Sequence, residues 1–271
     1  MTLATAAVRA QKFDAKTASF AIAFGDVVSS YREFSMFVLP GERVSLTVGD
    51  DAIQWTAPSH PGIYPMKYVR PTPPYDEITL RAIVLVPFSE VKDGYLNGYR
   101  IGDYPPPLKG NPIYTPPRGF VEVTKDNQDT KLSPHFELKQ FICKEDTTKT
   151  YPKYLIVQER LLLKLEAILG AVNDDLGVKM NTLHVMSAYR TPFYNHAIGD
   201  VKYSMHQFGS AADIYIDQIH DSKVLYDHIE TWLTTRPFAN LQGGMGFYPA
   251  TTAHPPFVHV DVRGTKARWR G

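Results

Sequence analysis

Residues 204–217 read SMHQFGSAADIYID, and this stretch determines how the C-terminal half of the chain is predicted to fold. Gly209 and the small residues after it allow the backbone to turn tightly behind His206. From position 212 the sequence alternates, so Asp213 and Tyr215 share one face of a strand, while Ile214 and Ile216 take the other. Asp213 is therefore expected at the start of a strand, on the face toward His206.

Residues 256–263, PFVHVDVR, form a second alternating stretch. Period-two spacing places Phe257, His259 and Asp261 on one strand face and three valines on the opposite face. A histidine and an aspartate beside a buried valine face are costly to bury without partners. The pattern indicates a strand that presents polar side chains to a site.

Two histidines and one carboxylate, His206, Asp213 and His259, form a ligand set typical of catalytic zinc, which leaves a fourth position for water. The alternative is a non-haem iron centre, which also uses two histidines and one carboxylate. His259 and Asp261 match its H-x-D element, but that interpretation needs a further histidine downstream. The ten residues after Asp261 contain none, so iron is disfavoured.

The sequence around these stretches predicts an α+β domain over residues 130–271, with an antiparallel sheet. Residues 152–177 show apolar residues at helical spacing, with Gly177 as the cap at the C-terminal end. Another helix is predicted over 221–236, and strands over 181–190, 209–217 and 256–263. Ser133 is expected to cap a short helix with Glu137 in its first turn.

The first half of the chain reads differently. Residues 18–90 are β-branched and aromatic segments separated by turn residues, which predicts an N-terminal β-sandwich-like domain over 1–94. Residues 95–129 begin with a proline-rich stretch that can be neither helix nor central strand. It is expected to be an extended connector packed along the surface. Its expected anchors are apolar and aromatic side chains, namely Tyr95, Tyr99, Ile101, Tyr104 and Tyr114.

Composition restricts the class of protein. The formal net charge is +1, and no polybasic run occurs, so nucleic acid is not an expected partner. No apolar run is long enough to predict a transmembrane segment. The single cysteine, Cys143, follows Phe141 and Ile142 and is expected to be a buried structural thiol. The N-terminal residues lack the basic and apolar regions of a signal peptide.

Five elements, in this order, carry a resemblance to a known family. They are SPHF at 133–136, SAYRTPFYN at 187–195, SMHQFGSAAD at 204–213, GGMGFYP at 243–249 and FVHVD at 257–261. Together they resemble the M15 zinc peptidases, in particular the branch of murein endopeptidases and D,D-carboxypeptidases. The wider superfamily includes VanX-type dipeptidases and the zinc-binding domain of hedgehog proteins. The resemblance covers about residues 130–263.

The resemblance implies roles for individual residues. His206, Asp213 and His259 match the zinc ligands of the family, so Zn2+ is the expected cofactor. Arg190 matches an arginine that binds and polarises the substrate carbonyl, which suits a fixed guanidinium. Ser204 matches a serine at the border of the substrate site. The predicted substrate contacts also include Tyr189 and Gly244, which lie within these motifs.

The sequence leaves the identity of the general base open. Other branches of the family have a glutamate three residues before the last zinc histidine, and Pro256 occupies that position here. Asp261 is favoured, either as the base or as a carboxylate that orients His259. The other candidate is His254. The glycines of QGGMG, including Gly244, are expected to let the backbone approach the substrate closely.

The resemblance predicts a zinc metallopeptidase that hydrolyses D-amino-acid-containing peptide bonds, such as D-Ala-D-Ala, in peptidoglycan stem peptides. Carboxypeptidase and endopeptidase action remain equally open. The alternative is a zinc-containing module that binds the cell wall without turnover, for which the missing glutamate is the reason. A peptidoglycan substrate implies a periplasmic or cell-wall location, with a targeting segment outside the given sequence.

Overall fold

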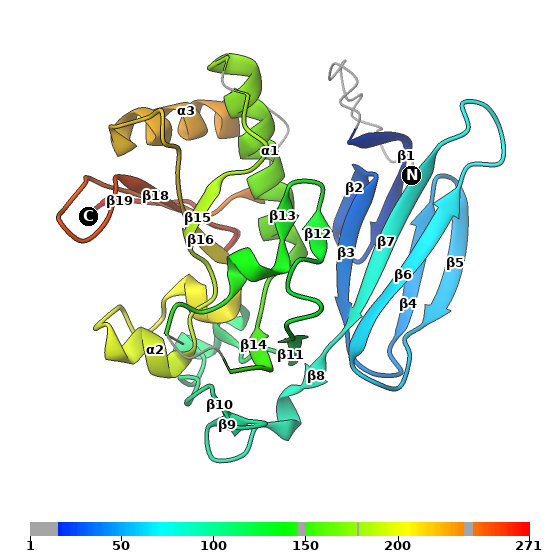
Figure 1. Cartoon of the computed structure of the whole chain (residues 1–271), viewed down its shortest axis with the longest axis horizontal. Coiled ribbons are helices and arrows are strands. Elements are labelled where there is room, and N and C mark those ends of the chain that lie inside the picture. Colours follow the sequence, from blue (N-terminus) through cyan, green and yellow to red (C-terminus); the bar gives the residue numbers. More distant parts are fainter. Residues whose placement is uncertain (1–15, 146–149, 178, 236–240) are drawn as a thin grey trace.

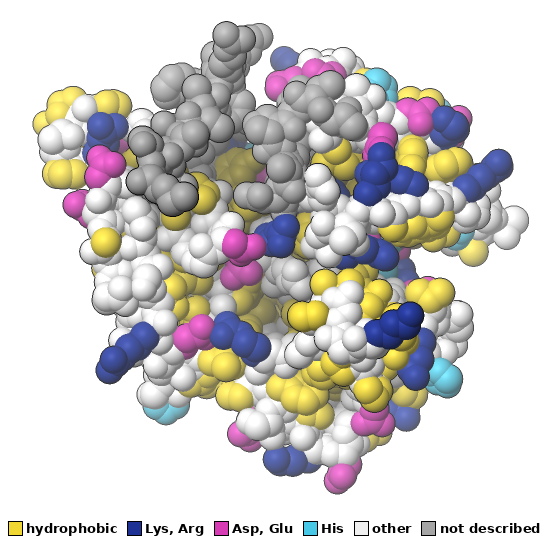
Figure 2. Space-filling view, turned by 180° about the vertical axis from the view of Figure 1, so that it is seen from behind, with side chains coloured by type: hydrophobic (Ala, Val, Ile, Leu, Met, Phe, Trp, Pro, Cys, Tyr) yellow, Lys and Arg dark blue, Asp and Glu magenta, His cyan; other side chains and the backbone are white. Residues whose placement is uncertain are grey.

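The computed structural model describes residues 16–145, 150–177, 179–235 and 241–271, and its fold is α+β. Strands predominate, and the longer helices belong to the C-terminal half (Figure 1). In the described residues, no helix is long and apolar enough to cross a membrane. On the face drawn in Figure 2, basic and acidic side chains are interspersed, as the balanced composition predicts.

Two sheets form from residues 17–84 and lie at the right of Figure 1. One has the strand order β2-β1-β4-β5 and is antiparallel; the other has the order β3-β7-β6, with β3 parallel to β7. Buried residues of both, such as Ile22 and Leu80, belong to one hydrophobic core. A sandwich of these sheets stays a prediction. The strands are β1 (Thr17–Phe24), β2 (Val27–Tyr31), β3 (Glu33–Val38), β4 (Arg43–Val48), β5 (Asp51–Thr56), β6 (Gly62–Val69) and β7 (Glu77–Val84).

The proline-rich region packs more deeply than a surface connector would. Ile101 is fully buried, and the Tyr104 ring contacts Phe88 and Phe208, whereas Tyr95 is 44% exposed and is not an anchor. The domain boundaries at 94 and 129 stay predictions. β8 (Val86–Pro87) and a 3-10 turn at Phe88–Glu90 precede this region, which contains β9 (Tyr95–Leu96), β10 (Tyr99–Arg100), β11 (Gly119–Val123) and 3-10 turns at Leu108–Gly110 and Pro112–Tyr114.

Two local predictions for residues 131–155 are wrong. Ser133 caps no helix: it ends a strand, and its hydroxyl donates to the buried carboxylate of Glu166 over 2.6 Å. The segment predicted as the first turns of a long helix is partly a strand, because Lys153–Leu155 pairs with β11. The elements are β12 (Lys131–Ser133), β13 (Phe136–Glu137), a 3-10 helix at Leu138–Phe141, and β14 (Lys153–Leu155). Cys143 is 2% exposed, as expected.

A five-stranded sheet carries the candidate site, with the order β15-β16-β18-β17-β19. The expected antiparallel sheet is correct for four strands and wrong at the edge, because β19 pairs parallel to β17. β19 lies beyond the sequence motifs, and neither β17 nor β19 was among the strands predicted from the sequence. The strands are β15 (His184–Ser187), β16 (Ala211–Tyr215), β17 (Gly244–Tyr248), β18 (Phe257–Asp261) and β19 (Ala267–Arg270).

Three helices accompany this sheet: α1 (Glu159–Asp175), α2 (Pro192–Ala197) and α3 (Ser222–Thr235). α3 packs against the face from which Phe247 and the valines of β18 project, with Tyr226 of α3 edge-on to Phe247. The valine face is therefore covered by α3 and buried, as the alternation predicted. The opposite face of the sheet is left for His259 and its neighbours.

Candidate metal centre

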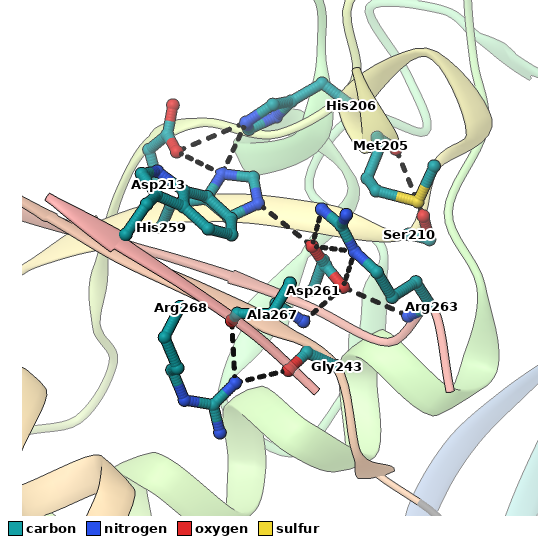
Figure 3. A network of polar contacts seen from close by, with 12 residues as sticks. Met205, His206, Ser210, Asp213, Gly243, His259, Asp261, Arg263, Ala267 and Arg268 are labelled. Carbon is teal, nitrogen blue, oxygen red and sulfur yellow. Dashed lines mark hydrogen bonds and ion pairs between the residues drawn. The ribbon is translucent and has the colours of Figure 1, made fainter. Parts of the chain in front are cut away.

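His206, Asp213 and His259 converge on one point, as Figure 3 shows. His206 Nε2 lies 3.2 Å from Asp213 Oδ1 and 3.1 Å from His259 Nδ1, and the latter two atoms are 3.0 Å apart. Each residue is less than a tenth exposed. The structure thus brings together all three residues that the sequence predicted as metal ligands, and His206, Asp213 and His259 are called the triad below.

Local structure explains this convergence. Asp213 and His259 are direct partners in the β16–β18 register, so their side chains leave the same face of the sheet next to each other. His206 lies on a short 3-10 helix, Met205–Phe208, that ends at Gly209 with φ +65°. A side chain at Gly209 would collide with the backbone of Ile156. Only glycine permits the turn that returns the chain from His206 into β16.

The proton positions on the two imidazoles favour a cation between them. His206 Nδ1 lies 2.6 Å from the carbonyl oxygen of Ala188, which can only accept a hydrogen bond, so the proton is on Nδ1. His259 Nε2 faces the Asp261 carboxylate at 3.3 Å, which places its proton there. The remaining nitrogens and Asp213 Oδ1 then direct three lone pairs at one another.

The spacing of these atoms also fits a metal. Ligand bonds of 2.0–2.1 Å in a tetrahedral site separate the ligand atoms by about 3.3 Å. The three observed separations of 3.0–3.2 Å are close to this value. Nitrogen and oxygen donors in a two-histidine, one-carboxylate set match Zn2+, and leave a fourth position for another ligand.

Arg190 holds the second oxygen of the carboxylate ligand. Its Nη2 donates to Asp213 Oδ2, its Nη1 to Asp200 Oδ2 at 2.6 Å, and its Nε to Ser187 Oγ at 2.9 Å. Although burial alone would raise the pKa of Asp213, His206 and His259 hold it well below its usual range. Asp213 is therefore ionised and fixed, with one oxygen on Arg190 and the other toward the histidines.

Asp261 is fully buried, and Figure 3 shows its carboxylate beside the His259 ring. Oδ1 accepts the backbone N–H groups of Gly244 and Arg263, and Oδ2 accepts Arg263 Nη2 at 2.6 Å as well as facing His259. Burial would raise the pKa of Asp261, but His259 and Arg263 lower it strongly. A carboxylate with so low a pKa and so many donors is a poor proton acceptor. Its geometry fits the orientation of His259.

The glycines of QGGMG make room for protein side chains. A side chain at Gly244 would collide with Asp261 and Trp269, and one at Gly246 would lie about 2 Å from the Trp269 indole. Trp269 is on β19, opposite Gly246, and its ring centroid is 5.1 Å from that of His259. Trp269 was not among the residues predicted from the sequence. The alternation in ARWR at 267–270 is the signal for its strand, but nothing local places it beside His259.

The other predicted residues lie around the centre without joining it. Ser204 is buried immediately before the 3-10 helix that carries His206. Tyr189 is 1% exposed, and its hydroxyl is 3.0 Å from that of Tyr104, so its ring is closed to a substrate in this structure. His254 packs edge-on against Phe257, and its Nδ1 lies 2.9 Å from the Pro255 carbonyl oxygen. Their predicted roles stay predictions.

Cavity size does not identify this centre. A hollow of about 500 Å³ at the β15 edge is lined by residues such as His184, Tyr215 and Pro255. Another, of about 250 Å³, lies between the N-terminal sheets and α1 and includes Phe37 and Glu159. No residue of the triad lines either one. The donor chemistry is the stronger indicator, because three convergent lone pairs require a positive partner.

Comparison with known families places this centre in context. Residues 154–269 match the family model Peptidase_M15_2, described as peptidoglycan L,D-endopeptidase MepK. The matched segment contains the whole triad, Arg190 and Asp261, and it confirms the resemblance to M15 peptidases over these residues. No curated protein and no solved structure gives a match.

Proposed function

Because residues 154–269 match a family of peptidoglycan peptidases, we propose that this protein is a zinc endopeptidase that hydrolyses stem peptides of peptidoglycan. The description of the matched family favours endopeptidase over carboxypeptidase action, and an L,D bond over the D-Ala-D-Ala bond. One observation carries the zinc assignment: His206, Asp213 and His259 direct three lone pairs at one point from buried, hydrogen-bonded positions.

Each residue of the centre has a distinct role in this proposal. His206 Nε2, His259 Nδ1 and Asp213 Oδ1 would hold the ion, which lowers the pKa of a bound water to about 7 and polarises a carbonyl. Ala188 and Asp261 fix the two imidazoles through their outer nitrogens, and Arg190 fixes Asp213. Hydrolysis adds the water oxygen to the carbonyl carbon and gives a proton to the departing amine.

The alternative function is a zinc-containing module that binds the cell wall without turnover, and one observation favours it. Pro256 occupies the position of the family glutamate, and Asp261 is enclosed by its donors. Neither residue can take a proton from water in this structure. Turnover then requires another base, and His254 stays a candidate.

The test combines metal content with cleavage. We expect one zinc per chain and cleavage of purified cross-linked muropeptides, with the product masses giving the bond. Chelation or His206→Ala should abolish both zinc retention and cleavage. The matched control is His220→Ala, because His220 is exposed and lies outside the centre; it should retain both.

The outcomes separate the two functions. Stoichiometric zinc and muropeptide binding without cleavage would favour the binding module. A wild-type protein that binds no zinc at micromolar concentration would contradict the metal centre itself. A peptidoglycan substrate also places the protein outside the cytoplasm, which fractionation of cells and detection in the periplasm or cell wall would test.

A further inference from the structure

The wall of the metal centre contains a phenol that the ligand set does not use. Tyr248 ends β17, two residues after Gly246, and Gly246 is the register partner of His259. Alternation along β17 therefore places Tyr248 on the same sheet face as the triad. Tyr248 is half-buried, so part of this side chain is open to solvent.

Neighbouring rings hold this phenol rigidly. The Tyr248 ring stacks on Phe257 with centroids 4.4 Å apart and planes 6° from parallel. The indole N–H of Trp269 donates to the Tyr248 hydroxyl oxygen over 2.8 Å. Trp269 itself is fixed between His259, at 5.1 Å between centroids, and the guanidinium of Arg263, at 5.6 Å from the ring centre.

The hydrogen-bond count leaves one donor free. A phenol has one proton to donate, and its oxygen can accept hydrogen bonds as well. Trp269 has no acceptor nitrogen, so the contact uses the oxygen of Tyr248 and not its proton. Among the described residues, no acceptor for that proton is found. Burial, with Asp213 and Asp200 nearby, raises the pKa of Tyr248, so the phenol keeps its proton at neutral pH.

We propose that Tyr248 donates a hydrogen bond to the substrate carbonyl oxygen as negative charge develops on it, and that Trp269 is the positioning residue for this donor. The inference rests on the proposed peptidase function and deepens it. The proton stays on Tyr248 throughout, because the contact is a hydrogen bond and not a transfer. Arg190, assigned by resemblance to the same carbonyl, is already bound to Asp213, Asp200 and Ser187, which leaves room for a second donor.

A donor aimed at developing charge affects the transition state more than the bound substrate. Tyr248→Phe should therefore lower kcat about 100-fold, the cost of losing one such donor, with KM little changed. It should weaken binding of a phosphinate analogue of the muropeptide, whose tetrahedral anion imitates that charge, by a similar factor. Trp269→Phe keeps an aromatic ring at this position but loses the indole N–H, so a smaller fall in kcat is expected.

The control is Tyr226→Phe. Tyr226 is also half-buried and contacts Phe247 of the same strand from α3, on the opposite face of the sheet. It should behave as wild type. Zinc content and the unfolding midpoint, measured for each variant, identify a variant that is merely misfolded.

The outcomes distinguish this inference from the function on which it rests. Cleavage by wild type with an equal kcat for Tyr248→Phe would overturn the donor role and leave the peptidase intact. A raised KM with unchanged kcat would overturn it too, because the contact would then act on the ground state. A wild-type protein that neither cleaves the muropeptide nor binds the phosphinate would overturn both.

Discussion

Asp261 is a buried charged residue that depends on several hydrogen-bond donors. Its carboxylate is fully buried, accepts hydrogen bonds from Gly244 and Arg263, and faces His259. From the other side, the buried ammonium of Lys164 donates to its backbone carbonyl over 2.7 Å. These hydrogen bonds fix the position of the Asp261 carboxylate. The fixed carboxylate in turn orients the His259 ring through Nε2.

Asp261→Asn tests this role. The substitution keeps the size of the side chain and removes the charge that balances Arg263 and strengthens the hydrogen bond from His259. Zinc affinity should fall about 10- to 100-fold, which is typical for loss of a carboxylate behind a histidine ligand. Competition with a chromogenic chelator measures it.

Asp217→Asn is the control. Asp217 also pairs with a histidine, His184 of β15, but both side chains of this pair are exposed. It should leave zinc affinity unchanged. Equal zinc affinity for Asp261→Asn and wild type would show that His259 needs no such support.

Among the elements, β17 and β19 are the ones whose pairing builds the wall of the centre. β17 presents Gly244 and Gly246 beneath the Trp269 indole, and β19 delivers that indole by pairing parallel to β17. Arg268 ties β19 down, since its guanidinium donates to the Gly243 carbonyl and pairs with Glu230 of α3. The position of Trp269 thus depends on β17 having glycine, which has no side chain, at positions 244 and 246.

Gly246→Ala should displace Trp269. The new Cβ would lie 2.1 Å from the indole nitrogen, so the ring or the strand must move. We expect a loss of about 1–3 kcal/mol in the free energy of unfolding, as for other overpacked sites. Denaturant unfolding measures the loss, and the emission of Trp269 should change with it.

Gly170→Ala provides the opposite control. Gly170 lies inside α1, and a Cβ there meets nothing within 4 Å. Alanine in a helix interior is about 0.5–1 kcal/mol more favourable than glycine, so this variant should gain stability. If both alanines stabilised the protein, the tight contact between Gly246 and Trp269 would be wrong.

Across the whole molecule, the N-terminal sheets and the C-terminal sheet share one hydrophobic core. Leu80 of β7 and Ile214 of β16 are both fully buried and belong to it. A polar contact also crosses between the parts: the Phe37 N–H donates to Glu159 at the start of α1 over 2.9 Å. These contacts predict a single cooperative unit.

Leu80→Ala and Ile214→Ala should therefore lower the same thermal transition. Each removes a large buried side chain, at a typical cost of about 2–5 kcal/mol. Calorimetry should show one peak for wild type and for both variants. Two peaks, each sensitive to only one substitution, would instead support the domain boundary at residue 94 as an independent folding boundary.

The sequence by itself determined the parts of the centre that depend on local periodicity. Alternation in 211–217 and 256–263 assigned Asp213 and His259 to one strand face each, and those faces meet in the structure. Helical spacing found α1, although its first predicted turns pair as β14 because Lys153–Leu155 completes a sheet with β11. The order of the motifs, through the family resemblance, supplied the predicted roles of His206 and Arg190.

The tertiary structure alone decided which side chains surround that centre. Tyr248 and Trp269 meet through the parallel β17–β19 pairing, and Asp261 is enclosed by Gly244 and Arg263. Period-two alternation says which face a residue takes, but not which strand lies beside it. Neighbours in a sheet are chosen by hydrogen bonds and packing between distant segments, so the wall of the site follows only from the folded chain.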